Sequence, residues 1–122
     1  MTLGRRVLVV DDDDSIREFV VLALAEDGYE VLTAADGRAA LDVSAAHPPG
    51  LILLDMRMPV MDGWAFAAAY RATAAPHAPI AVLTAARDAA RYAADIDADA
   101  FLAKPFALSE LSQLVRRFLG ER

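Results

Sequence analysis

The sequence contains no cysteine, no long apolar run and few basic residues. Without cysteine, disulfides, thiol chemistry and cysteine-ligated metals are excluded. No apolar run approaches the roughly 20 residues that a transmembrane helix needs, so we expect no contact with a membrane. The 12 basic residues are outnumbered by 18 acidic ones, and the net charge of −6 argues against direct nucleic-acid binding. The amino terminus lacks the pattern of a secretory signal, which makes the cytoplasm the expected location.

What the chain does have is a large apolar fraction, 57% of its 122 residues. That fraction excludes a disordered protein, and the length suffices for one domain with a buried core. No linker-like or repeated segment divides the sequence, so we expect a single domain over residues 1–122.

Short apolar runs alternate with segments of helical periodicity. Strands are expected at residues 7–10, 29–33, 51–54, 80–83 and 100–103. Runs that are apolar at every position indicate strands covered on both faces. The alternation of such strands with helices predicts an α/β fold, a doubly wound sandwich with a five-stranded parallel sheet.

The helical segments carry their own boundary signals. Ser15 and Glu18 have the spacing of a capping box, which predicts that Ser15 caps the first helix. Gly28 is expected to end that helix. The last helix is expected to bury Leu108 on its apolar face. The helix over residues 87–95 has few large side chains, so we expect it to be the least firmly packed.

Residues 51–63 read L-I-L-L-D-M-R-M-P-V-M-D-G. The apolar run ends on Asp55, at the carboxyl end of a predicted central strand, where open parallel sheets bind ligands. Pro59 forces an extended or turning chain, and Gly63 lies where the next helix begins. We therefore expect Asp55 to take part in chemistry; the alternative is that it only caps the following helix.

Polar side chains also end other predicted strands. Asp11 and Asp12 follow the first, Thr84 ends the fourth and Lys104 ends the fifth. Carboxylates that meet at one edge repel each other, by about 4 kcal/mol for charges roughly 4 Å apart at an effective dielectric of about 20. A bound Mg²⁺ would offset this repulsion, because it is usually held by one or two carboxylates together with water and phosphate oxygens.

Lys104 is the only lysine of the chain. Its compact ammonium suits a point contact with a carboxylate or a phosphoryl oxygen, and the Thr84 hydroxyl could contact a phosphoryl oxygen too. The alternatives are an ordinary surface lysine and a threonine that is merely a β-branched strand residue.

The segments V-V-D-D, L-L-D-M-R-M-P-V-M-D-G, V-L-T-A and K-P-F, in this order and at these spacings, resemble the receiver domain of two-component response regulators. The resemblance extends from Val7 to the last helix. It implies a flavodoxin-like (βα)5 fold with strand order 2-1-3-4-5. It also implies that Asp55 accepts a phosphoryl group from a histidine kinase or a histidine phosphotransfer protein. Such a protein is regulatory and catalyses only its own phosphorylation and dephosphorylation.

The resemblance also assigns a metal site. Mg²⁺, which Mn²⁺ can replace, would be held by Asp12 directly, by Asp11 through water, by Asp55 and by the backbone carbonyl of Arg57.

Further roles follow from the resemblance at the fourth and fifth strands. Thr84 and Lys104 would hold phosphoryl oxygens, and Phe101 would change rotamer when Thr84 moves. The bond between Lys104 and Pro105 would be a cis peptide, a form that is rare except before proline.

The face formed by the fourth helix, fifth strand and last helix is expected to contact a downstream target or a second copy of the chain. The reason is that a weakly anchored fourth helix is easily repositioned. Candidate contact residues are Arg87, Arg91, Tyr92 and Phe106.

The sequence departs from the family pattern at several positions. Asp13 and Asp14 extend the acidic pair, so charge alone does not decide which aspartates bind metal. Asp97 stands where the family often has glycine, and we expect it to adopt the left-handed conformation at small cost. Arg57 and Ala86 are expected to border the phosphoryl group and to tune its hydrolysis.

Two other functions stay open. The run from Asp11 to Ser15 also fits the D-x-D-x-[ST] signature of haloacid-dehalogenase-like phosphatases, which would make Asp11 a nucleophile. Such enzymes need a further acidic pair after Lys104, which this chain lacks, and Asp55 would have no role. The other possibility is a phosphorylation-independent interaction module. The intact set of Asp, Thr and Lys argues against it.

Overall fold

The computed structural model describes residues 5–120, in which five strands alternate with five helices. The strands are β1 (Arg6–Val10), β2 (Glu30–Ala34), β3 (Leu51–Asp55), β4 (Ile80–Ala85) and β5 (Ala100–Lys104). The helices are α1 (Asp14–Glu26), α2 (Gly37–Ala46), α3 (Gly63–Arg71), α4 (Ala86–Asp95) and α5 (Leu108–Leu119). The expected strands are confirmed to within one or two residues at their ends.

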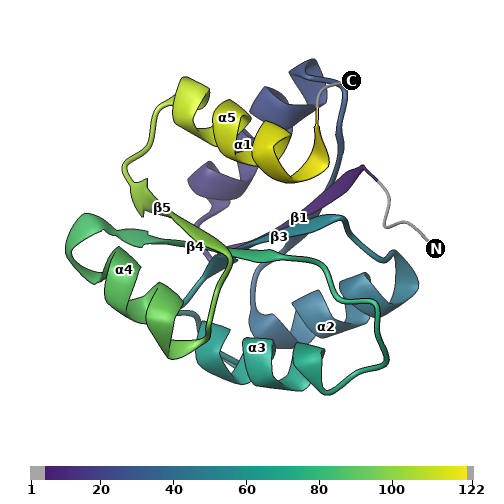
Figure 1. Ribbon diagram of the computed structural model, residues 1–122. Helices are drawn as coiled ribbons and strands as arrows, with labels where there is room; N and C mark the ends of the chain where they lie inside the picture. The colour runs from purple at the N-terminus through teal and green to yellow at the C-terminus, as the bar shows by residue number, and fades with distance from the viewer. Residues whose placement is uncertain (1–4, 121–122) are drawn as a thin grey trace.

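The strands form one parallel sheet in the order β2-β1-β3-β4-β5. Helices α1 and α5 cover one face of the sheet, and α2, α3 and α4 cover the other (Figure 1). The doubly wound, flavodoxin-like fold is therefore confirmed. Within residues 5–120, no helix is long and apolar enough to cross a membrane.

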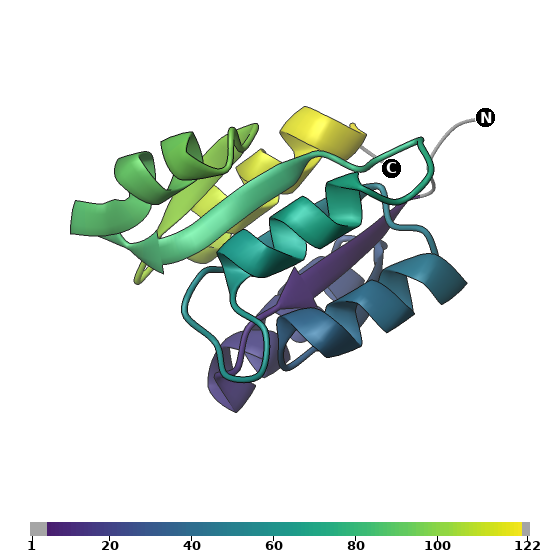
Figure 2. The ribbon, with the colours of Figure 1, turned by 90° about the horizontal axis from the view of Figure 1, so that it is seen from below.

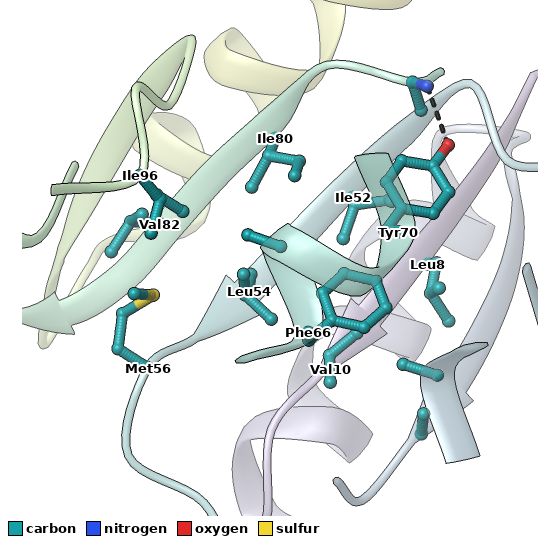
Figure 3. Close-up of a cluster of buried hydrophobic side chains, with 14 of the residues drawn as sticks. Leu8, Val10, Ile52, Leu54, Met56, Phe66, Tyr70, Ile80, Val82 and Ile96 are labelled. Atoms are coloured by element: carbon teal, nitrogen blue, oxygen red, sulfur yellow. Dashed lines mark hydrogen bonds between the residues drawn. The ribbon is translucent and has the colours of Figure 1, made fainter. Parts of the chain in front are cut away.

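The central strand β3 is buried at every position, as its unbroken apolar run predicts. Its side chains alternate between two cores. Ile52 and Leu54 belong to the core under α2, α3 and α4, whereas Leu51 and Leu53 belong to the core under α1 and α5. Figure 3 shows the first core, where the Tyr70 hydroxyl accepts a hydrogen bond from the Ala78 N–H at 2.8 Å. Helices thus cover both faces of the sheet.

The predicted capping box at Ser15 is wrong. The N-cap of α1 is Asp13, two residues before the predicted one, and the helix begins at Asp14. The Asp13 carboxylate accepts hydrogen bonds from the N–H groups of Ser15 (2.8 Å) and Ile16 (3.4 Å). In a run of polar residues several side chains can cap, and the path of the chain out of β1 selects Asp13. The predicted stop is confirmed, since Gly28 follows the helix with a φ of 90°.

Helix α4 is more firmly held than its alanine-rich sequence predicts. Its small residues let the helix lie close to the sheet, so that Tyr92 is only 4% exposed. The Trp64 indole N–H donates to Asp95 Oδ2 at 3.1 Å. The Arg71 guanidinium donates to the carbonyls of Ile96 and Asp97 just after the helix. Polar contacts from α3 therefore supply the anchoring that large apolar residues would otherwise give.

Two smaller expectations have opposite outcomes. Asp97 adopts the left-handed conformation, with a φ of 52°, as predicted. Leu108, expected to be buried in α5, is 52% exposed, and Leu114 is buried instead. The first residue of the helix lies at the rim of the sheet, beyond the apolar face that the sheet covers.

Gly63 allows a close approach between the start of α3 and the end of β3. A Cβ atom at this position would lie 2.6 Å from Met56 Sδ and 2.9 Å from the Asp55 carbonyl oxygen. We expect Gly63→Ala to lower the free energy of unfolding by about 1–3 kcal/mol, the usual effect of overpacking. Urea denaturation measures it. The exposed substitution Ala68→Ser in the same helix should change it by less than about 0.5 kcal/mol. An unchanged midpoint for Gly63→Ala would show that Met56 moves away freely.

Candidate functional site

The parallel register brings the polar strand ends to one edge of the sheet. Asp55 in β3 pairs with Leu83 in β4, so Thr84 lies one residue beyond it. Lys104 in β5 pairs with Ala85. Figure 2 shows the arrowheads of β1 and β4 at the same end of the molecule. Asp11 directly follows β1 at this edge, and its backbone N–H donates to the Ala34 carbonyl.

Lys104 lies between two buried carboxylates. Its Nζ atom is 2.7 Å from Asp11 Oδ2 and 3.8 Å from Asp55 Oδ1, and its side chain is only 24% exposed. The alternative of an ordinary surface lysine is therefore rejected. Asp11 is completely buried, and its Oδ1 atom accepts the Asp13 N–H at 3.0 Å. Its Oδ2 atom has the ammonium as an ionic partner but makes no hydrogen bond.

Asp55 carries a strongly shifted pKa. Its pKa is raised from 3.8 to about 7; burial of the carboxyl group is the largest cause, followed by the negative charge of Asp11. Lys104 and the Arg57 backbone N–H favour the ionised form and lower the pKa in part, whereas a hydrogen bond with Asp12 raises it. The single ammonium therefore does not balance the acidic groups around it.

Asp55 has no capping role in the following helix. The N-cap of α3 is Asp62, whose carboxylate accepts the Ala65 N–H at 2.9 Å. Between the two aspartates the chain turns at Pro59, whose carbonyl accepts the Met61 N–H at 2.7 Å. The alternative interpretation of Asp55 as a helix cap is thus rejected, and its carboxylate is left for chemistry.

The acidic residues fit a hard divalent cation. Carboxylate oxygens of Asp11, Asp12 and Asp55 lie within 4.8 Å of one another. Asp12 is exposed and lines an open cleft of about 290 Å³ together with Arg57 and Trp64. Excess negative charge and a set of ligands made only of carboxylate oxygens suit Mg²⁺. Of the remaining acidic run, Asp13 caps α1 and Asp14 pairs with Arg17.

Comparison with known proteins agrees with this geometry. A sequence profile of the response regulator receiver domain matches residues 7–116. The chain belongs to the response regulator receiver family. Receiver domains bind Mg²⁺ at an acidic cluster, which here corresponds to Asp11, Asp12 and Asp55.

The similarity of this receiver domain to individual proteins covers nearly its whole length. It is 43% identical over 116 residues to the response regulator MprA of Mycolicibacterium vanbaalenii, a match that covers 93% of this chain and 50% of that protein. The receiver domain thus spans about half the length of the curated relatives it matches.

Solved structures give the same result. The chemotaxis response regulator CheY4 of Vibrio cholerae has a TM-score of 0.84 at 36% identity, with 98% of this chain and 100% of that chain covered. The receiver domain of NtrX from Brucella abortus has a TM-score of 0.83 at 30% identity, with 93% and 97% covered.

The structure shows where the residues predicted at the ends of the fourth and fifth strands and on the partner face lie. The Lys104–Pro105 peptide bond is cis, as predicted. Thr84 is buried at the edge beside Asp55, and Phe101 is half-exposed on β5. Tyr92 was predicted to contact partners, but this is wrong because its ring is buried.

The other proposed contact residues of the receiver domain remain available. Arg87 and Arg91 are exposed, and both pair with Asp88 on α4. Phe106 is half-buried, with its ring centre 5.9 Å from that of Phe19 on α1.

One contact near the site was not predicted. The Arg57 guanidinium donates two hydrogen bonds to the Tyr92 hydroxyl, at 3.1 Å from Nε and 2.8 Å from Nη2. The two residues are 35 positions apart. No local pattern in the sequence marks such a pair, because α4 must first dock on the sheet to bring the ring beside the loop.

The geometry predicts which aspartates of the receiver domain bind metal. We expect Asp12→Ala to weaken Mg²⁺ binding by about tenfold or more, since even outer-shell substitutions cause losses of that size. Asp14→Ala should bind Mg²⁺ as the native chain does, because Asp14 pairs with Arg17 on the surface of α1 and lies outside the cluster of Asp11, Asp12 and Asp55. The fluorescence of Trp64, which lines the cleft with Asp12, can follow the titration. The opposite order of affinities would show that the metal uses the later part of the acidic run.

Proposed function

We propose that this receiver domain accepts a phosphoryl group on Asp55 from the phosphohistidine of a histidine kinase or a histidine phosphotransfer protein. The observation that carries the proposal is the position of Asp55. Its carboxylate ends the central strand, has Lys104 Nζ at 3.8 Å and caps no helix. A carboxylate kept buried beside other carboxylates costs stability, so its placement favours a role in chemistry.

The reaction follows from these groups. A carboxylate oxygen of Asp55 attacks phosphorus while the bond from phosphorus to the histidine nitrogen breaks. The electron pair stays on the imidazole, which takes up a proton, and an aspartyl phosphate forms. Catalysis of such a transfer is mostly positioning and stabilisation of charge.

The surrounding side chains of the receiver domain have distinct parts in this proposal. The Lys104 ammonium and the Thr84 hydroxyl would contact phosphoryl oxygens on two sides. Mg²⁺, when bound by Asp11, Asp12 and Asp55, would neutralise charge on the phosphoryl oxygens. The backbone carbonyl of Arg57 is a further proposed ligand, and Mn²⁺ is expected to support the same chemistry.

The biological setting is part of the same proposal. Residues 1–122 act as one receiver domain in the cytoplasm, as a regulatory phosphoacceptor rather than an enzyme with a separate substrate. The face formed by α4, β5 and α5 contacts a downstream target or a second copy. Arg87, Arg91 and Phe106 are the candidate contacts on this face, with Phe101 changing rotamer between the two states.

The phosphatase alternative is not favoured. It requires Asp11 as the nucleophile, but Asp11 is completely buried and its two oxygens lie against the Asp13 N–H and the Lys104 ammonium. The family comparison also points to a receiver domain.

Mapping of the modified residue tests the proposal. The chain is incubated with acetyl phosphate and Mg²⁺, and its intact mass should increase by one phosphoryl group. Reduction of the aspartyl phosphate with borohydride marks the residue, and peptide mass analysis should place the mark on Asp55. A mark on Asp11 would support the phosphatase alternative instead.

A further inference from the structure

Arg57 connects the loop after Asp55 to helix α4. Besides its two hydrogen bonds to the Tyr92 hydroxyl, its Cζ atom lies 5.6 Å from the centre of the ring. The charge of Asp88, in the first turn of α4, also acts on this guanidinium. Arg57 itself is exposed. The hydrogen bonds that hold this exposed cation on the buried ring thus go to one neutral oxygen.

The same arginine is also anchored beside the proposed phosphoacceptor. The Arg57 backbone N–H acts on the Asp55 carboxylate and lowers its pKa. The residue lines the cleft that Asp12 also lines. A phosphoryl group on Asp55 would bring up to two negative charges to this place. The phosphoryl group would offer the guanidinium an anionic acceptor with several oxygens that two N–H groups can contact side by side, which the single neutral oxygen of a phenol does not.

We propose that Arg57 exchanges partners when Asp55 is phosphorylated, leaving the Tyr92 hydroxyl for the phosphoryl oxygens and thereby releasing α4. This inference rests on the proposed function of Asp55. Arg57 acts here as a positioning residue, which holds α4 in the unphosphorylated state through its contact with Tyr92.

The surroundings of Tyr92 explain why α4 responds to this exchange. A buried hydroxyl that loses two donors is destabilised until it finds new partners, so the ring has a reason to move. The Trp64 ring meets Tyr92 edge-on with its centre 4.8 Å away. The Trp64 indole also donates to Asp95 at the end of α4. A shift of α4 therefore changes the environment of Trp64.

Trp64 is the only tryptophan of the chain, so its fluorescence reports on this contact. Beryllofluoride, a phosphoryl mimic, is titrated in the presence of Mg²⁺ while the emission is recorded. Tyr92→Phe removes only the hydroxyl that holds Arg57, and we expect it to lower the half-saturating beryllofluoride concentration by about tenfold. In an Arg57→Gln background, the same Tyr92→Phe substitution should change this concentration by less than about twofold.

Tyr29→Phe is the matched control. Tyr29 is also buried, its hydroxyl donates to the Gly120 carbonyl at 2.8 Å, and Arg5 lies over its ring at 4.8 Å. It packs in the other core, under α1 and α5. Tyr29→Phe should therefore leave the half-saturating concentration unchanged. A decrease of the same size in this control would mean that loss of a buried hydroxyl acts through general loosening, which overturns the exchange.

The acetyl phosphate adduct separates the two proposals. If no adduct forms on Asp55, the proposed function fails and the exchange fails with it. If the adduct forms but Trp64 emission does not respond to beryllofluoride, the exchange alone is overturned. The exchange is also wrong if Tyr92→Phe has no effect, or has an equal effect with Arg57 and with Gln at position 57.

Discussion

The Asp55→Asn chain, incubated with acetyl phosphate and Mg²⁺, is expected to keep its unmodified mass, whereas the native chain gains one phosphoryl group. Asparagine has nearly the same size, but its amide oxygen is a poor nucleophile and carries no negative charge. The buried site should tolerate it, because it removes the charge that burial and Asp11 disfavour. Loss of the adduct is therefore expected to reflect chemistry rather than unfolding. Intact mass spectrometry measures the result.

Asp36→Asn is the control for this comparison. Asp36 lies between β2 and α2, and its carboxylate caps α2 by accepting the Ala39 N–H at 2.8 Å. Asparagine caps helices as well as aspartate does, so this variant should fold and accept a phosphoryl group like the native chain. An adduct that persists in Asp55→Asn would contradict the proposal and direct the search to the other carboxylates of the acidic cluster.

The same substitution is expected to stabilise the fold at alkaline pH. The pKa of Asp55 is 3.8 for an unperturbed carboxyl and about 7 in the folded chain, chiefly because of burial. Between these values the folded state binds more protons at Asp55 than the unfolded state does. The stabilisation from this protonation is full below about pH 4 and is lost as the pH rises through 7. At pH 8 we expect Asp55→Asn to raise the free energy of unfolding by about 2–4 kcal/mol.

Urea denaturation in the presence of a chelator, at several values between pH 4 and pH 8, measures this effect. The native chain should lose stability relative to Asp55→Asn as the pH rises through this window. Groups far from the site titrate equally in both chains, so the difference between them reports on Asp55 together with the neighbouring charges that act on it. Added Mg²⁺ should stabilise the native chain at pH 8 more than it stabilises the variant, since the metal favours the ionised carboxylate. A difference that stays constant across the window would show that the pKa of Asp55 is not raised.

The part of the fold that could be predicted from the sequence depends on local patterns. Continuous apolar runs such as residues 51–54 are strands because only a strand of that length places every side chain in a doubly covered sheet. The order of strands and helices then limits the possible topologies, because parallel crossovers are right-handed. Asp55, Thr84 and Lys104 could be grouped on this basis, since residues at the carboxyl ends of parallel strands share one edge.

Other features needed the assembled chain. The choice of Asp13 rather than Ser15 as the cap depends on where β1 leaves the sheet, and both side chains fit the local pattern. The burial of Leu114 and the exposure of Leu108 depend on how far α5 extends past the rim of the sheet. Several side chains satisfy the same helical period, and only packing decides which of them are covered.

The sequence by itself determined the fold class, the family and the identity of the acidic, hydroxyl and ammonium groups at the site. Only the tertiary structure decided how strongly these groups act on each other, because burial and distance set the pKa of Asp55 and place Lys104 between it and Asp11. It also decided that Tyr92 is a buried partner of Arg57 and not a surface contact. The physical reason is that periodicity and turn chemistry act over a few residues. Electrostatic fields and side-chain contacts depend on segments that meet only after folding.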